Sequence, residues 1–174
     1  MKYFTYSEFD SHDEPGSGKK MKASTLNKLD KAREYAGIPF IINSGYRTAQ
    51  HNAKVGGVKD SAHTEGYAAD IRADATSYAT ILAALIKAGF KRIGLENGSI
   101  HADDDPDKPT PAVWLYDSTN NEAFKKLQTA TLAMIKNTKT EADTQTAGIG
   151  WILAGLGTLA IIAANSTKNN SKKG

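Results

Sequence analysis

Residues 92–103 read RIGLENGSIHAD, and this stretch decides the fold that the sequence predicts. Asn97 and Gly98 separate two short runs of strand-forming residues, and an Asn-Gly pair tolerates the positive φ angles of a two-residue type I′ turn. The pattern therefore predicts a β-hairpin with strands over 92–96 and 99–103.

One face of this hairpin carries side chains that can bind a metal or move a proton. Because side chains alternate along a strand, Ser99, His101 and Asp103 share a face, and Glu96, which pairs with Ser99, points the same way. Asp103 lies roughly 7 Å from His101 along the strand, and Glu96 lies at a diagonal reach of roughly 7–8 Å. Either carboxylate could serve as a general base. Alternatively, Asp103 orients His101 and Glu96 is an exposed hairpin residue.

Helix and strand patterns flank the hairpin. We expect helices from Ser24 to a stop at Gly37, from Thr76 to a stop at Gly89, and over 121–137. Short apolar runs predict strands over 38–43 (IPFIIN) and 112–116 (AVWLY). The mixture predicts an α+β fold, with one small domain over 1–118 that has an antiparallel sheet and flanking helices.

Upstream of the hairpin, SAHTEGYAADI (residues 61–71) supplies two more candidate metal ligands. Seven positions separate His63 from Asp70, which excludes the helical pair of an H-E-x-x-H site and suits a loop that turns into a strand. Catalytic zinc takes three protein ligands and keeps a position open for water, and His63, Asp70 and His101 provide such a set. In the alternative interpretation, His63 is a surface loop histidine, Asp70 caps or pairs with Arg72, and His101 is an ordinary strand residue.

Composition limits the remaining chemistry. The 174 residues include no cysteine, which excludes a disulfide scaffold, a thiol nucleophile and a Cys-ligated metal. Residues 1–118 carry 15 basic and 16 acidic side chains, whereas residues 119–174 carry 7 and 3. Because a near-neutral domain gives no electrostatic footprint for nucleic acid, we expect no nucleic-acid partner.

The C-terminal part differs from the domain. After a helix and polar linker over 119–146, residues 147–164 (AGIGWILAGLGTLAIIAA) run for 18 positions without a charge, and a basic polar tail occupies 165–174. As a helix this run would be roughly 27 Å long, close to the ~30 Å of a bilayer core. We therefore expect a transmembrane helix, with a buried or oligomerisation helix as the alternative. The N-terminus lacks the pattern of a signal peptide.

Three runs resemble the zinc D-Ala-D-Ala carboxypeptidase family, which also contains peptidoglycan endopeptidases. They are SGYRTAQHNAKVGG (44–57), SAHTEGYAADI (61–71) and IHADDDP (100–106). The chain is most similar to short single-domain members common in bacteriophages, over about residues 3–116. The pattern S-x-H-x-x-G-x-A-x-D followed by a distal histidine is the specific part of the resemblance.

The resemblance implies a small zinc peptidase with His63, Asp70 and His101 as ligands of Zn²⁺. Arg47 and Ser61 match positions that contact substrate or hold the site. Arg47 is a guanidinium suited to binding a carboxylate, with a structural ion pair as the alternative. Many members place the catalytic acid three residues before the last histidine, where this chain has a glycine. Because the similar subgroup shows H-x-D, we expect Asp103 as general base, with Glu96 in reserve.

The function expected from the sequence is therefore zinc-dependent cleavage of stem-peptide or cross-bridge amide bonds in bacterial peptidoglycan. Residues 147–164 would anchor the enzyme in a virion membrane or host cell membrane, as a phage virion-associated or lysis enzyme. The alternatives are a non-catalytic virion structural or wall-binding protein that retains the fold, and a holin-like membrane role for the tail.

Overall fold

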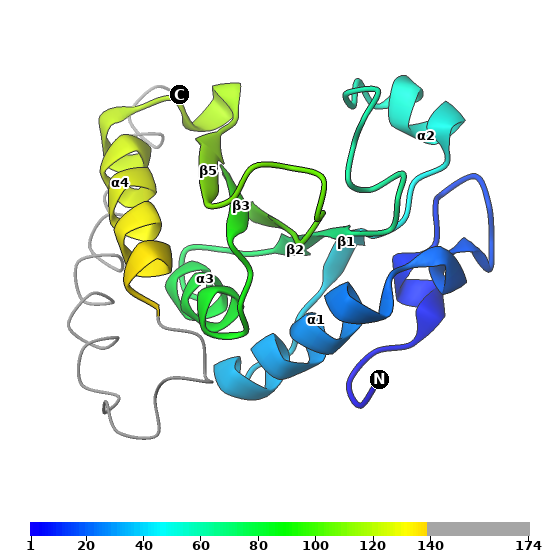
Figure 1. Cartoon of the computed structure of the whole chain (residues 1–174), viewed down its shortest axis with the longest axis horizontal. Coiled ribbons are helices and arrows are strands. Elements are labelled where there is room, and N and C mark those ends of the chain that lie inside the picture. The colour runs from blue at the N-terminus through cyan, green and yellow to red at the C-terminus, as the bar shows by residue number, and fades with distance from the viewer. Residues whose placement is uncertain (139–174) are drawn as a thin grey trace.

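A five-stranded mixed sheet organises residues 1–138, the part of the chain that the computed structural model describes (Figure 1). In the sheet order β1-β2-β4-β3-β5, the strands are β1 Ile42–Ser44, β2 Ala68–Arg72, β4 Ser99–Asp103, β3 Arg92–Glu96 and β5 Ala112–Leu115. The α-helices are α1 Ala23–Ala36, α2 Ala49–Lys54, α3 Tyr78–Lys87 and α4 Glu122–Asn137. Short 3₁₀ helices cover Tyr6–Phe9, Ser17–Lys20 and Asp117–Thr119. The α+β prediction is confirmed.

The hairpin has the predicted register. Glu96 pairs with Ser99 across the turn, and Gly98 adopts a φ of 82°, which glycine tolerates without strain. Because this pairing is fixed by a two-residue turn, Glu96, Ser99 and His101 occupy the face positions expected from the sequence.

The expectation of an antiparallel sheet holds for the pairs β1–β2, β2–β4 and β3–β4 and is wrong for β5, which pairs in parallel with β3. Asp103, the last residue of β4, lies opposite Arg92, and Ala112, the first residue of β5, also pairs with Arg92. Residues 104–111 thus carry the chain past β3 at one end of the sheet. A strand that returns from there on the far side of β3 must run parallel to it.

The strand predicted over 38–43 is displaced. Sheet pairing begins only at Ile42, which lies opposite Ile71, so β1 covers Ile42–Ser44. The helix predicted over 121–137 is confirmed as α4, and the Asn121 side chain caps its first turn.

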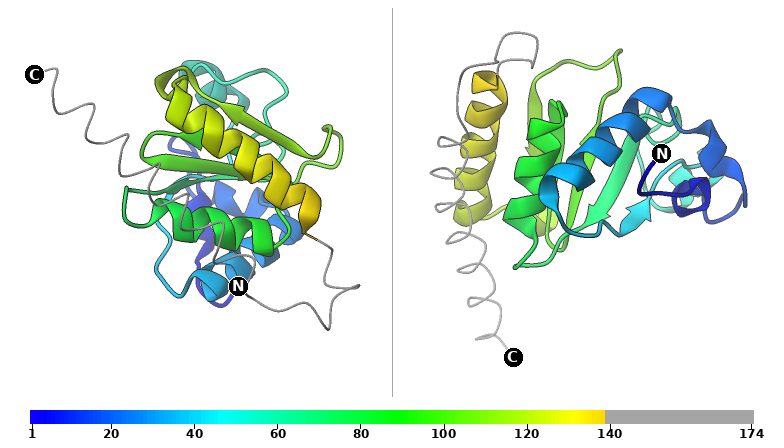
Figure 2. Two further views of the ribbon diagram at one scale, coloured as in Figure 1. Left: turned by 90° about the vertical axis from the view of Figure 1, so that its left-hand side faces the viewer. Right: turned by 90° about the horizontal axis from the view of Figure 1, so that it is seen from below.

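The core lies between the sheet and a layer formed by α1, α3 and α4, which run along one sheet face (Figure 2). Residues that point toward this layer are fully buried, among them Ile71, Ile93 and Ile100. Their neighbours in sequence point to the opposite face. This alternation leaves Asp70 and His101 on the face away from the helices.

Within residues 1–138, no helix combines the length and apolarity needed to cross a membrane. The predicted transmembrane segment 147–164, the linker residues 139–146 and the basic tail 165–174 lie outside the described residues.

Candidate metal centre

The candidate metal centre lies on one row of directly paired residues that crosses the sheet. Cross-strand pairing aligns one residue from each strand, in the order Ser44, Asp70, His101, Gly94 and Trp114. Directly paired residues point to the same face, so Asp70 and His101 lie side by side. The Trp114 ring packs beside the His101 ring, with centroids 5.2 Å apart.

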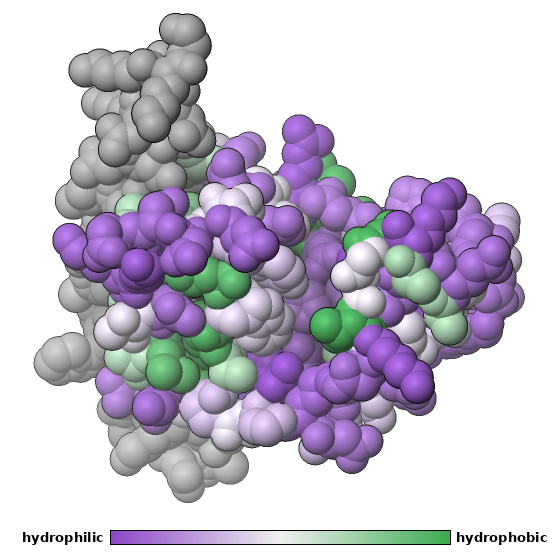
Figure 3. All heavy atoms as spheres, turned by 90° about the horizontal axis from the view of Figure 1, so that it is seen from above, coloured by the Kyte–Doolittle hydropathy of each residue, from purple (hydrophilic) through white to green (hydrophobic). Residues whose placement is uncertain are grey.

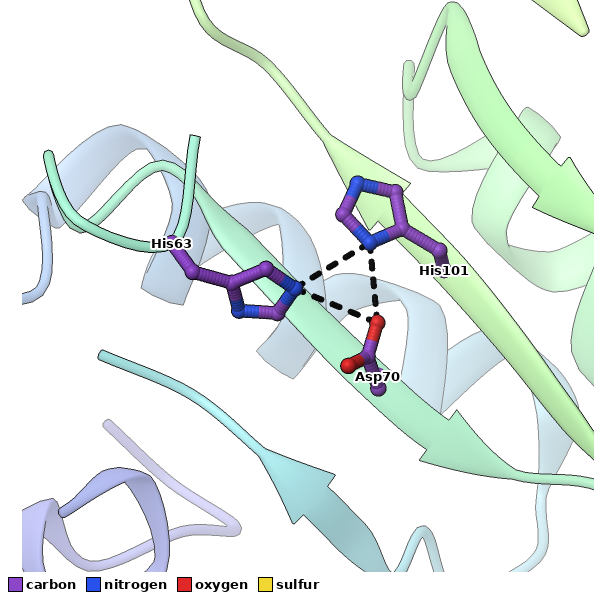
Figure 4. Close-up of side chains that lie close together, drawn as sticks. All are labelled: His63, Asp70 and His101. Carbon is purple, nitrogen blue, oxygen red and sulfur yellow. Dashed lines mark hydrogen bonds and ion pairs between the residues drawn. The ribbon is translucent and has the colours of Figure 1, made fainter. Parts of the chain in front are cut away.

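His63 reaches this row from the loop before β2. Its Nε2 atom lies 3.2 Å from Asp70 Oδ1 and 3.2 Å from His101 Nδ1, while His101 Nδ1 lies 2.8 Å from Asp70 Oδ1 (Figure 4). Gly66, with a φ of 80°, allows the loop to turn, and its Cα faces the Lys20 carbonyl too closely for any side chain. Among residues 1–138, these three side chains form the group that could hold a metal ion.

The outer nitrogen of each imidazole has a fixed partner. His63 Nδ1 lies 2.6 Å from the carbonyl oxygen of Gly45, and His101 Nε2 lies 3.1 Å from Asp103 Oδ2. Metal binding requires neutral imidazoles, and in that state each acceptor takes the N–H. The lone pairs of His63 Nε2 and His101 Nδ1 are then directed to the same point, which is the usual arrangement around a bound metal.

The distances fit a tetrahedral ion. Ligand atoms bound at zinc–nitrogen and zinc–oxygen lengths would lie roughly 3.3 Å apart, and the three separations here are 2.8–3.2 Å. Two imidazoles and one carboxylate are the donor set of a catalytic zinc site with an open fourth position. The residues present therefore fit this metal.

Arg47 holds the second oxygen of Asp70. Its Nη2 atom donates to Asp70 Oδ2, and its Nε atom donates to Ser44 Oγ at 2.7 Å. Burial disfavours the Asp70 carboxylate, but the neighbouring His63 and His101 outweigh burial and hold the pKa of Asp70 well below its usual value. The alternative pairing of Asp70 with Arg72 is wrong, because Arg47 takes that place.

Asp103 lies on the other side of His101. Its Oδ2 faces His101 Nε2, its Oδ1 accepts from Arg92 Nε at 2.7 Å, and it is 1% exposed. Burial opposes a charge on His101, but the bonds to Asp103 and Asp70 outweigh it and raise the pKa of His101 to about 9. Arg92, which the sequence did not single out, thus fixes the Asp103 carboxylate, and Asp103 in turn orients His101.

Glu96 is half-buried at the end of the hairpin, facing the centre. Burial and then the charge of Asp70 raise the pKa of Glu96, while His101 and Arg47 act on it in the opposite direction. Its carboxylate therefore lies close enough to Asp70, His101 and Arg47 for their charges to act on it.

Ser61 lies at the start of the His63 loop and is buried. Its Oγ accepts from the His63 backbone N–H at 3.4 Å, and its carbonyl accepts from Thr64 Oγ1 at 2.7 Å. These contacts stabilise the loop that presents His63.

A recess of about 530 Å³ adjoins the centre through Ser44 and Arg47. Its other side includes His12, His51 and Lys54, and the two histidine rings stack with centroids 5.2 Å apart. Figure 3 shows this face of the molecule hollowed between raised, mostly hydrophilic parts. A peptide segment is of suitable size for such a recess.

Comparison with known proteins gives the family. The family model for Peptidase M15 matches residues 2–103, which include His63, Asp70 and His101. The chain belongs to the peptidase M15 family. The family that the sequence motifs predicted is thereby confirmed.

One M15 relative is the zinc D-Ala-D-Ala carboxypeptidase of Streptomyces albus G, which is 32% identical to this chain over 99 residues. The alignment covers 52% of this chain and 39% of the relative, so the chain spans about two fifths of that protein. The family match ends at Asp103 and leaves β5, with Trp114, beyond it. Sequence reasoning predicted that strand but missed the position of its Trp114 ring beside His101.

Proposed function

We propose that this M15 peptidase hydrolyses amide bonds in peptidoglycan peptides, with zinc held by His63, Asp70 and His101. The observation that carries the proposal is the cluster itself, in which both imidazoles are oriented by Gly45 and Asp103 so that their free nitrogens meet the Asp70 carboxylate. Family membership and the activity for which the Streptomyces relative is named support the same reaction and the same metal.

Zinc bound at this site would lower the pKa of a coordinated water toward ~7 and polarise the scissile carbonyl. We assign the general base to Glu96, whose carboxylate faces the centre. It accepts a proton from the attacking water and passes it to the leaving nitrogen, so that amide and water become a carboxylic acid and an amine. The raised pKa of Glu96 suits a group that both takes and returns a proton.

Asp103, the base expected from the H-x-D pattern, is given a different role in this proposal. Both of its oxygens are engaged, one by His101 and the other by Arg92. The carboxylate lies at the imidazole nitrogen that points away from Asp70. Asp103 therefore orients His101, as carboxylates commonly do for metal-bound histidines.

Arg47 connects the centre to the recess. It is tied to Asp70 and Ser44 and also lines the recess wall. A guanidinium has five N–H donors, so Arg47 can hold Asp70 and still offer donors to a substrate carboxylate in the recess, the role the family resemblance gave it.

The proposal includes a membrane location, in a virion or host cell membrane, for an enzyme of phage entry or lysis. The run of 18 uncharged residues over 147–164 supports the membrane location, and the resemblance to short phage members supports the phage role. Flotation of the full chain with lipid vesicles should show binding that is lost when the chain is cut after residue 146. Equal flotation of both forms would refute this part.

The activity is tested by mass spectrometry of purified peptidoglycan digested with the full chain, beside His63→Ala and a chelated sample. We expect new muropeptides only with zinc and intact His63. Loss of a terminal residue would define a carboxypeptidase, and a broken cross-bridge an endopeptidase. A folded, zinc-loaded protein that binds the wall without new products would refute hydrolysis and favour the wall-binding alternative.

A further inference from the structure

Tyr116 follows directly after β5, and its ring lies over the sheet face that carries the metal cluster. A Cβ atom on Gly94 would lie 2.9 Å from Tyr116 Cε2 and 2.8 Å from Trp114 Nε1. Gly94 is also the direct cross-strand partner of His101. The missing side chain at Gly94 therefore provides the space in which both aromatic rings approach the metal centre.

The Tyr116 side chain lies beside Trp114, and both rings pack over Gly94. The Trp114 indole acts on the Tyr116 hydroxyl in the sense that lowers its pKa, and because an indole nitrogen can only donate, it is the hydroxyl oxygen that faces this donor. The hydroxyl proton is then available for a different acceptor. Thus Trp114 packs against the His101 ring and shares the space over Gly94 with Tyr116.

The hydroxyl shares the space of the reacting groups. Asp70 and Glu96 lie near enough for their charges to act on Tyr116, and so does Arg47. Burial, and then the charge of Asp70, raise the pKa of Tyr116 to about 12, so the side chain remains a neutral donor at neutral pH. Arg47, which also lies near this space, is bonded to Asp70 and Ser44, and its remaining donors are assigned to the substrate carboxylate in the recess.

We propose that Tyr116 is a further catalytic residue, whose hydroxyl donates a hydrogen bond to the scissile carbonyl oxygen as negative charge develops there. The inference rests on the proposed function. Water adds to the carbonyl carbon, the carbon–nitrogen bond breaks, and Glu96 carries the proton to the nitrogen, while Tyr116 keeps its own proton throughout. A donor aimed at developing charge acts mainly on the transition state. Because the family match ends at Asp103, it does not include this residue.

The first test compares the zinc-loaded full chain with Tyr116→Phe in hydrolysis of a soluble muropeptide. We expect kcat to fall about 10²-fold, with KM and zinc content unchanged. Tyr6→Phe is the matched control, since Tyr6 is 47% exposed on the first 3₁₀ helix and should leave kcat as it is. A kcat for Tyr116→Phe within twofold of the wild type would overturn the proposal.

A second test does not depend on turnover. A phosphinate analogue of the peptide carries a tetrahedral, charged group where the amide was, and calorimetry gives its Kd. We expect Tyr116→Phe to weaken phosphinate binding about 10-fold or more, with the binding of the uncleaved peptide unchanged. Equal phosphinate Kd values for both proteins would overturn the role of Tyr116. A wild type that forms no products would refute the proposed function, and the phosphinate comparison would still decide for or against the Tyr116 contact.

Discussion

His101 lies between two carboxylates, with Nε2 3.1 Å from Asp103 Oδ2 and Nδ1 2.8 Å from Asp70 Oδ1. Metal binding requires the imidazole to be neutral, with one N–H and one lone pair. Asp103 is itself held by Arg92 at 2.7 Å and therefore fixes the N–H on its own side. The lone pair is left on the side of Asp70 and His63, where a metal can use it.

This arrangement predicts that substitutions of the two candidate bases, Asp103 and Glu96, impair the enzyme in different ways. Asp103→Asn should weaken zinc binding 10- to 100-fold, because it loosens the orientation of His101, and saturating zinc should restore most activity. Glu96→Gln should keep zinc but lose about 10²- to 10⁴-fold in kcat, because proton transfer is lost. Zinc titration and kcat at saturating zinc separate the two. The reverse pattern, an inactive zinc-loaded Asp103→Asn beside an active Glu96→Gln, would make Asp103 the base.

The ligand assignment predicts that His63→Ala, Asp70→Ala and His101→Ala each lose stoichiometric zinc, because a three-ligand site left with two ligands binds weakly. Elemental analysis after dialysis measures the zinc per chain. His51→Ala is the control for zinc content, since His51 stacks on His12 outside the cluster. Equimolar zinc in His63→Ala would contradict the assignment.

Gly94→Ala should destabilise the domain by about 1–3 kcal/mol, because the new Cβ would meet Trp114 at 2.8 Å and Tyr116 at 2.9 Å. Urea unfolding measures the change. In a Trp114→Ala background the same substitution should cost less, since one of the two rings is gone. Equal costs in both backgrounds would show that crowding by Trp114 is not the cause.

Asp74 lies away from the metal centre, and its hydrogen bonds predict that the stability of the fold depends on pH. Its Oδ1 accepts from the side chains and the backbone N–H groups of Thr76 and Ser77 before α3. These hydrogen bonds lower the pKa of Asp74 from 3.8 to about 2, and those from the Thr76 and Ser77 side chains contribute most. Because the folded-state pKa is depressed, the carboxylate stabilises the fold above pH 4, and its contribution is lost as the pH falls from about 4 to 2.

Asp74→Ala should therefore lower Tm at pH 7, and the difference from wild type should shrink below pH 4. Thermal unfolding across this range measures it. Asp117→Ala is the comparison, since Asp117 is exposed and starts only a short 3₁₀ helix. An Asp74→Ala difference that stays constant from pH 7 to pH 2 would exclude the carboxylate as its source.

The hairpin could be predicted from the sequence because its register is a local property. The Asn97-Gly98 turn fixes which residues pair, and alternation then places Glu96, His101 and Asp103 on one face. Asp70 and His63 were found from residue type and motif. Their contact with His101 depends on β2 pairing with β4, which is a long-range feature of the fold.

The roles of the carboxylates could not be predicted in the same way. Alternation gives the face of Asp103 but not which imidazole nitrogen it meets, because the His101 rotamer depends on Asp70 and Trp114 from other strands. Nor does any local pattern show that β5 lies beside β3, which brings Trp114 next to His101. Arg92 and the Gly45 carbonyl contribute through contacts that no sequence spacing reveals.

The central claim is zinc-dependent cleavage of wall peptides, and metal reconstitution tests it most directly. The full chain is stripped with a chelator and reloaded with increasing zinc, and new amino groups released from purified peptidoglycan are counted. We predict no release by the stripped protein and full recovery at about one zinc per chain, with no recovery for His63→Ala. Release at an unchanged rate by the stripped protein, or none by the reloaded protein, would contradict the account.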